Sequence, residues 1–259
     1  MKFWLRKNSR QQIIKKGFPA DWLEIIENNV RFYNLLPASL KEELQQLVQI
    51  FLAEKFFEGC AGLLITDEIK LTIAAQACIL LLGQDHDIYP KLRTILVYPT
   101  AYFAPETHYL KDGTMIESIQ FRFGESWARG QVVLAWDEIK QDTLDINDGQ
   151  NLVYHEFAHQ LDHEYGIIDS IPDLLQRTSY VTWARIISNE YDRLVSDIMN
   201  NRQTLLNEYG ATNQAEFFAV ATEYYFEKPI ELKKLHPDLY DQLKDFYNID
   251  TALLIQRQI

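Results

Sequence analysis

Cysteine is scarce in this chain of 259 residues, which contains only Cys60 and Cys78. Both stand in apolar surroundings, and they do not have the CxxC spacing of a redox motif or a structural zinc site. A disulfide framework is therefore excluded, and we expect two free thiols. Free thiols are typical of a reducing compartment, so the sequence favours a cytoplasmic location.

Basic residues are few relative to acidic ones, since 25 Lys and Arg stand against 37 Asp and Glu and give a formal net charge of −12. Nucleic-acid affinity depends largely on Lys and Arg, so direct binding to nucleic acid is not expected. The segment 1–18 is locally basic, but neither an apolar core nor a small-residue cleavage site of a secretory signal follows it. We interpret this segment as a solvated basic tail, with contact to an anionic membrane surface as the alternative.

Long hydrophobic runs are absent, and the longest, "ACILLLG" at 77–83, is far too short to cross a bilayer. Hydrophobic residues nevertheless make up 47% of the chain, which is enough for a sizeable core. The sequence therefore predicts a folded protein without a membrane span.

Apolar residues recur at three- and four-residue intervals over 21–58, on both sides of "PASLKEE". This spacing predicts two helices, the second capped by Ser39 with Glu42 or Glu43 in its first turn. A further helix is expected to begin at Thr66 and to end at Gly83.

Short β-branched and aromatic runs follow and predict strands within 93–103, 118–124 and 130–136, with a turn at the "DG" of 112–113. The C-terminal third returns to helical spacing, with one helix ending before Pro229 and a last short helix over 236–248. Helices segregated around a small mixed sheet indicate an α+β fold. We expect one domain, 1–259, with an N-terminal lobe over about 20–166 and a C-terminal helical lobe over about 167–259.

Residues 155–159 read "HEFAH", which is the HExxH motif. A helix places His155 and His159 on one face about 6 Å apart, so both imidazoles can reach one zinc ion. Glu156 is rotated by roughly 100° and can act on a water molecule as a general base. Asn147 as N-cap and Gly166 as the terminating glycine complete the expected helix.

The third ligand is not evident from this helix. His163 lies eight residues, or about 12 Å, beyond His155, so we interpret it as a surface residue. Asp162, one turn after His159, is a candidate hydrogen-bond partner of a ligand imidazole. Further along the chain, Glu216 and Glu223 are seven residues apart on one helical face, and spacing alone leaves either as the third ligand.

The chain also resembles a known family in "GESWARGQVVLAWDEI", "HEFAHQLD" and "YGATNQAEFFAVATEYYFE", which occur in this order. These segments resemble the Mlc titration factor A family, which are zinc-dependent peptidases of the zincin type. The resemblance covers most of residues 20–250 and implies a zincin-like metallopeptidase fold, with the active-site HExxH helix between N-terminal helices and the C-terminal lobe.

The resemblance implies one Zn2+ ion per chain, with His155, His159 and Glu216 as ligands and Glu156 as the catalytic glutamate. A tyrosine just upstream of the third ligand falls on Tyr209. This chain differs from the family pattern at Gly210 and Gln214, where alanine and proline are common. The family is cytoplasmic, has aminopeptidase-like activity, and includes an anti-repressor of sugar-uptake regulation that binds a transcriptional repressor of the Mlc type.

The sequence thus predicts hydrolysis of a peptide substrate by a zinc-activated water, with Glu156 as general base. The sequence alone favours a buried core position for Tyr209, whereas the resemblance implies that its hydroxyl stabilises the oxyanion. The alternative is a regulatory protein that sequesters a repressor and has secondary or no peptidase activity. The segment 130–136 is either an edge strand that holds the peptide or a central strand. Core packing is the default expectation for three tryptophans that are also candidates to line a cleft, Trp127, Trp136 and Trp183.

Overall fold

The computed structural model of the chain describes residues 2–84, 87–109, 115–122, 124–127, 130–144, 147–166 and 177–257. Its helices are α1 (Lys2–Ile14), α2 (Ala20–Asn29), α3 (Arg31–Leu35), α4 (Ala38–Glu54), α5 (Asp67–Ile79), α6 (Trp136–Asp142), α7 (Leu152–Tyr165), α8 (Arg177–Met199), the 3-10 turn η1 (Glu208–Ala211), α9 (Gln214–Glu227), α10 (Pro229–Leu235), α11 (Pro237–Tyr247) and α12 (Thr251–Gln256). Its strands are β1 (Phe56–Gly59), β2 (Thr94–Tyr98), β3 (Tyr102–Tyr109), β4 (Met115–Arg122), β5 (Gly124–Trp127) and β6 (Gln131–Ala135). The α+β class is confirmed.

A four-stranded sheet has the order β1-β2-β6-β5, in which the first three strands are parallel and β5 is antiparallel to β6. The expected small mixed sheet is therefore confirmed. The interpretation of 130–136 as an edge strand is wrong, because β6 lies between β2 and β5. Four consecutive residues of β6, from Val132 to Ala135, are buried, as in a strand covered on both faces. The edges belong to β1 and β5, while β3 and β4 form a separate antiparallel pair.

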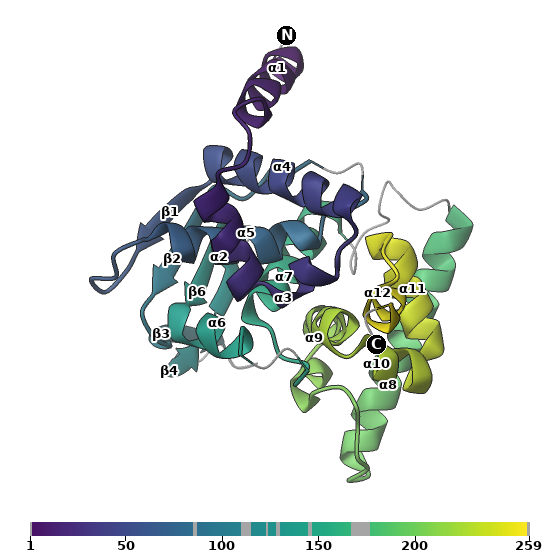
Figure 1. Cartoon of the computed structure of the whole chain (residues 1–259). Coiled ribbons are helices and arrows are strands. Elements are labelled where there is room, and N and C mark those ends of the chain that lie inside the picture. Colours follow the sequence, from purple (N-terminus) through teal and green to yellow (C-terminus); the bar gives the residue numbers. More distant parts are fainter. Residues whose placement is uncertain are drawn as a thin grey trace.

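Helix α5 is buried on all sides and packs against α2, α4 and α7 (Figure 1). Thr66 accepts a hydrogen bond from the Ile69 amide, so its predicted capping role is confirmed. The helix ends at Ile79 rather than at Gly83, which lies in the following turn with φ +67°.

Three other expectations about the N-terminal half are wrong. Ser39 does not cap α4, because the helix already begins at Ala38 after the extended Pro37. Residues 56–59 form β1 rather than the end of a helix. The basic N-terminal segment is helix α1, which extends away from the body in Figure 1. It is not wholly a solvated tail, because Arg10 forms an ion pair of 2.6 Å with each of Glu54 and Asp87.

In the C-terminal half, α9 lies between α7 and the helices α8 and α11 (Figure 1). Eleven consecutive residues of α9, from Phe217 to Glu227, are buried. Helix α9 ends before Pro229 as predicted, but α12 follows the helix that was expected to be the last. Buried residues of α5, α7 and α9 belong to one continuous core, and the division into two lobes of a single domain stays a prediction.

Three further expectations concern the cysteines, membrane spans and the turn at 112–113. Cys60 and Cys78 are free thiols, as predicted. Within the described ranges, none of the helices combines the length and the apolar character that a membrane span requires. The "DG" turn expected at 112–113 lies outside the described residues.

The start of α7 differs from the prediction, because its N-cap is Asn151 and not Asn147. The Asn151 Oδ1 atom accepts a hydrogen bond of 3.0 Å from the Tyr154 amide. The helix cannot begin earlier because Gly149 has φ +82°, a left-handed conformation. At the other end, Gly166 has φ +60° and its amide bonds to the Asp162 carbonyl, so the predicted terminating glycine is confirmed.

Three acidic side chains from other elements hold this first turn of α7. Asp142 Oδ2 accepts from the Leu152 amide at 2.8 Å, and Glu223 Oε2 accepts from the Asn151 amide at 2.7 Å. Glu227 Oε1 accepts from the Asn151 side-chain amide at 3.1 Å. Main-chain amide groups at a helix N-terminus have no partner within the helix and carry partial positive charge, so Asp142 and Glu223 stabilise the start of α7.

We expect Gly149→Ala to destabilise the protein for two reasons. The backbone of the alanine must adopt the left-handed conformation, which costs about 1–2 kcal/mol for a residue with a side chain. The added Cβ would also lie 2.7 Å from the Tyr224 ring, and such overpacking costs about 1–3 kcal/mol. Gly62→Ala is the matched control, because Gly62 also has φ +82° but has no atom within 4 Å of an added Cβ. Urea unfolding of both variants measures the difference, and an equal loss of stability would contradict the contribution of the ring.

Glu227 makes stability depend on pH. Burial raises the pKa of this carboxyl to about 10, so the folded state keeps a proton that the unfolded chain releases as pH rises. The free energy of unfolding is then expected to fall between about pH 5 and pH 10, by up to about 1.4 kcal/mol per pH unit for this group. In Glu227→Gln this contribution disappears and the decline becomes shallower. Urea unfolding across that pH range tests this, and the prediction fails if wild type and variant have the same slope.

Candidate metal centre

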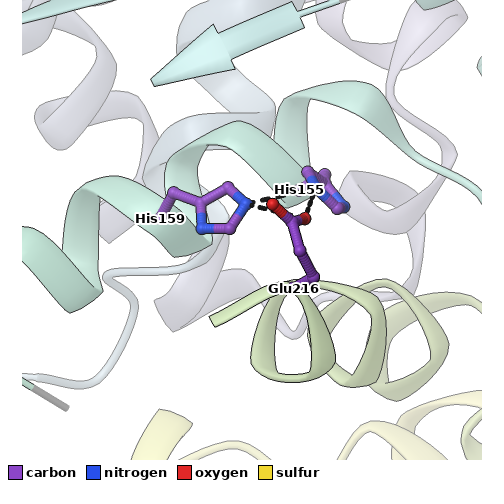
Figure 2. Close-up of side chains that lie close together, drawn as sticks. All are labelled: His155, His159 and Glu216. Carbon is purple, nitrogen blue, oxygen red and sulfur yellow. Dashed lines mark hydrogen bonds and ion pairs between the residues drawn. The ribbon is translucent and has the colours of Figure 1, made fainter. Parts of the chain in front are cut away.

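His155 and His159 of α7 meet Glu216 of α9 in one cluster of potential ligand atoms. Their Nε2 atoms are 3.2 Å apart, and Glu216 Oε2 lies 3.0 Å from His155 Nε2 and 3.2 Å from His159 Nε2. Figure 2 shows the Glu216 carboxylate pointing from α9 toward both imidazoles. Among the described residues, these three side chains form the one group of His, Cys, Asp and Glu that is close enough to hold a metal ion.

The geometry and chemistry of the three donors fit a metal ion. Tetrahedral coordination with bonds of about 2.0–2.1 Å places ligand atoms about 3.3–3.4 Å apart, which is close to the separations in this cluster. Two imidazole nitrogens and one carboxylate oxygen form the His2Glu set of catalytic zinc sites. Calcium and magnesium prefer oxygen ligands throughout, so the two nitrogens disfavour them.

Glu216 is placed by the start of α9. Asn213 is the N-cap, and its Oδ1 atom accepts hydrogen bonds from the Ala215 and Glu216 amides at 2.9 Å and 3.0 Å. Gln214 occupies the first helical position, where proline is well tolerated because the position needs no amide donor. The departure from the family pattern at this residue therefore leaves the helix start intact.

Glu223, the alternative third ligand, lies on the other side of His155. Its Oε1 atom is 2.8 Å from His155 Nδ1, while its Oε2 atom accepts from the Asn151 amide. A carboxylate on Nδ1 places the ring proton there and leaves the Nε2 lone pair free for a metal ion. The structure thus brings Glu216 to the Nε2 atoms and Glu223 to the opposite nitrogen, and the assignment of Glu216 as a ligand stays a prediction.

Negative charge around the cluster shifts the protonation of its members. Burial favours the neutral imidazole, but the charge of Glu223 and the bond with Glu216 raise the pKa of His155 well above its ordinary value. Burial opposes ionisation of Glu216, yet its hydrogen bonds with His155 and His159 outweigh this and lower its pKa to about 2. The site therefore attracts positive charge, in the form of a proton or of a metal ion.

Glu156 is separated from the ligand cluster, as the helical spacing predicted. It is buried, with 5% of its surface exposed, and its Oε2 atom has no hydrogen-bond partner among the described residues. Burial raises the pKa of this carboxyl to about 7, although the charges of His155 and His159 act in the opposite direction. A carboxyl with a pKa near neutrality can accept and return a proton at physiological pH, as a general base requires.

Tyr209 lies in η1, directly before α9, and is 54% exposed. Its ring centroid is 5.9 Å from that of His155, so the structure places this residue beside the cluster. Asn207 caps η1 by accepting from the Tyr209 amide at 2.9 Å. Gly210 is buried against Leu194 and Val220, and an added Cβ would lie 3.3 Å from the nearer side chain. Close packing therefore favours a small residue there.

Other residues singled out from the sequence have these outcomes. His163 is exposed and is not part of the cluster, as predicted. The partnership of Asp162 with a ligand imidazole stays a prediction. Trp136 and Trp183 are buried and belong to the core, whereas the side chain of Trp127 lies outside the described residues.

Sequence reasoning missed two groups of the site. The Asn151 cap had a signal, because a capping residue type stands directly before the periodic segment. The contact between Gly124 and Glu156 had no signal in the sequence, because the two residues are distant in the chain. A Cβ atom at Gly124 would lie 2.5 Å from Glu156 Oε1.

Comparison with known proteins finds relatives over most of the chain. A family model described as glucose-regulated metallo-peptidase M90 matches residues 3–248. An uncharacterized protein of Synechocystis sp. is 41% identical over 245 residues, which cover 94% of this chain and 89% of that protein. Mlc titration factor A of Pectobacterium atrosepticum is 30% identical over 221 residues, covering 83% and 82%. The same-named protein of Yersinia pestis is 28% identical over 260 residues, covering 98% and 92%. The chain therefore belongs to the glucose-regulated metallo-peptidase M90 family, as the resemblance predicted.

Proposed function

We propose that the chain is a zinc peptidase of the zincin type that hydrolyses peptide bonds and acts in the cytoplasm. The observation that carries this proposal is the meeting of His155, His159 and Glu216 at 3.0–3.2 Å, with Glu156 on the same helix as the two histidines. His155, His159 and Glu216 would hold one zinc ion. When bound, that ion supplies Lewis-acid chemistry, which polarises a carbonyl group and makes water more acidic.

The protein residues account for the proton transfers. Glu156 accepts a proton from the attacking water at its carboxylate and later returns it to the amine that leaves. Burial raises the pKa of this carboxyl above its ordinary value, which makes its carboxylate a stronger base for the first step. Glu223 holds the orientation of His155 through the 2.8 Å bond to Nδ1.

Tyr209 has the complementary role of stabilising negative charge on the substrate oxygen. Its phenol donates a hydrogen bond to the oxyanion that develops during attack, a contribution typically worth about 3–4 kcal/mol. Exposure of more than half of its surface leaves the side chain accessible to a substrate. We further propose an aminopeptidase-like preference for short peptide substrates.

Removal of one histidine ligand tests metal binding. His159→Gln is expected to lose most bound zinc, because the remaining two donors cannot complete the site. His163→Gln is the matched control, since His163 lies one turn further along α7, is exposed and is outside the cluster. Metal analysis of the purified proteins should give about one zinc ion per chain in wild type and in the control. Equal zinc contents in the two variants would refute the ligand assignment.

Glu156→Gln tests catalysis separately from metal binding. The amide cannot take up a proton, so hydrolysis of chromogenic amino-acid and peptide substrates should fall at least about 100-fold while zinc is retained. Glu208→Gln, an exposed residue in η1, provides the control with the same chemical change. Unchanged hydrolysis in Glu156→Gln would overturn the proposed peptidase activity.

A second function is favoured by the name of the relatives from Pectobacterium atrosepticum and Yersinia pestis, Mlc titration factor A. It is the sequestration of a transcriptional repressor of the Mlc type, an anti-repressor role that does not require hydrolysis. The same Glu156→Gln variant separates the two functions. Full affinity of the variant for such a repressor would make binding independent of catalysis, and loss of both would tie them to one site.

A further inference from the structure

We propose that Gly124, on the edge strand β5, is the residue that positions Glu156, and that its missing side chain is what leaves room for the carboxylate. This inference rests on the proposed function of Glu156 as general base. It concerns a residue that is not a member of the ligand cluster and lies directly against the base.

Gly124 of β5 packs closely against two side chains of α7. A Cβ atom at Gly124 would lie 2.5 Å from Glu156 Oε1 and 2.9 Å from its Cδ, and 2.8 Å from Leu152 Cδ1. Nonbonded carbon and oxygen atoms do not approach so closely, so a methyl group at this position forces one of these neighbours to move. With strand and helix in their present positions, a side chain at residue 124 therefore conflicts with the position of the carboxylate.

The backbone gives no other reason for glycine at this position. Gly124 is not among the glycines with positive φ, so alanine is compatible with its conformation. It pairs with Leu134 of β6 in regular antiparallel register, without a bulge in the described pairing. The requirement for glycine comes from the close approach of the strand to the helix, and such an approach is a common reason for glycine within a strand.

The surroundings of Glu156 limit how it can respond to a methyl group. Its side chain is buried, and the next residue along the helix, Phe157, is fully buried in the core. Of the three atoms in contact with the added Cβ, two belong to Glu156. Displacement of the carboxylate is the expected result, and a misplacement of about 1 Å can reduce a rate about 100-fold.

Gly124→Ala is the test, with zinc content, kcat and KM measured on chromogenic peptide substrates. We expect one zinc ion per chain as in wild type, KM within about twofold, and kcat lower by about 100-fold. Loss of zinc or a rise in KM with unchanged kcat would overturn the proposal, because the variant would then act on the metal site or on substrate binding.

A second measurement does not depend on activity. We compare the melting temperatures of Gly124→Ala, Glu156→Ala and the double variant. Contacting residues are not additive, so Gly124→Ala should lower the melting temperature by about half as much or less when the Glu156 carboxylate has been removed. Gly210→Ala, another glycine without positive φ, is the control and should have the same effect in both backgrounds.

Leu152→Ala provides the competing background. If Gly124→Ala becomes harmless only when Leu152 is shortened, the methyl group displaces Leu152 and the proposal is wrong. An equal effect of Gly124→Ala in every background also overturns it, because the strand itself then absorbs the methyl group. Peptide hydrolysis that persists in Glu156→Gln would overturn the proposed function instead, and the melting temperatures would still decide whether Gly124 positions Glu156.

Discussion

The Glu223 carboxylate is the interaction on which the arrangement of the site depends. One of its oxygens bonds to the Asn151 amide at the start of α7, and the other bonds to His155 Nδ1. A single buried side chain of α9 therefore fixes both the beginning of the HExxH helix and the orientation of its first histidine. Since α9 also carries Glu216, the position of one helix relative to the other determines the separations between Glu216 and the two histidines.

The acidic groups at the first turn of α7 stabilise the helix, but their burial close to one another costs free energy. The charge of Glu223 adds to the effect of burial in raising the pKa of Asp142 and of Glu227. Burial raises the pKa of Asp142 to about 7 and that of Glu227 to about 10. Their hydrogen bonds to the first turn of α7 offset part of this cost, because partial positive charge is concentrated at that end of the helix.

Much of the fold and site could be predicted from local sequence. The i, i+4 spacing of His155 and His159 is a property of any helix, and the terminating Gly166 follows from its own left-handed preference. Thr66 is predictable in the same way, because its cap involves residues three apart. These features depend on neighbours in the chain, which a sequence displays directly.

The predictions that were wrong or stayed open concern contacts between residues that are distant in the chain. Spacing alone could not separate Glu216 from Glu223, because both lie on one face of α9 and differ only in which nitrogen of His155 they reach. The position of 130–136 within the sheet depends on which strands flank it, and strand order is not encoded locally. The N-cap of α7 was predicted at the wrong residue, because Gly149, with its left-handed conformation, stands between Asn147 and the actual first turn.

The anchoring of Asn151 also bears on the motion of the site. His155 and Glu156 stand only four and five residues after the cap, in the part of a helix that frays most readily in isolation. Bonds from α6 and α9 to this turn oppose such fraying. The entropy of ordering the two residues is then lost once, when the chain folds, and not again each time a substrate binds.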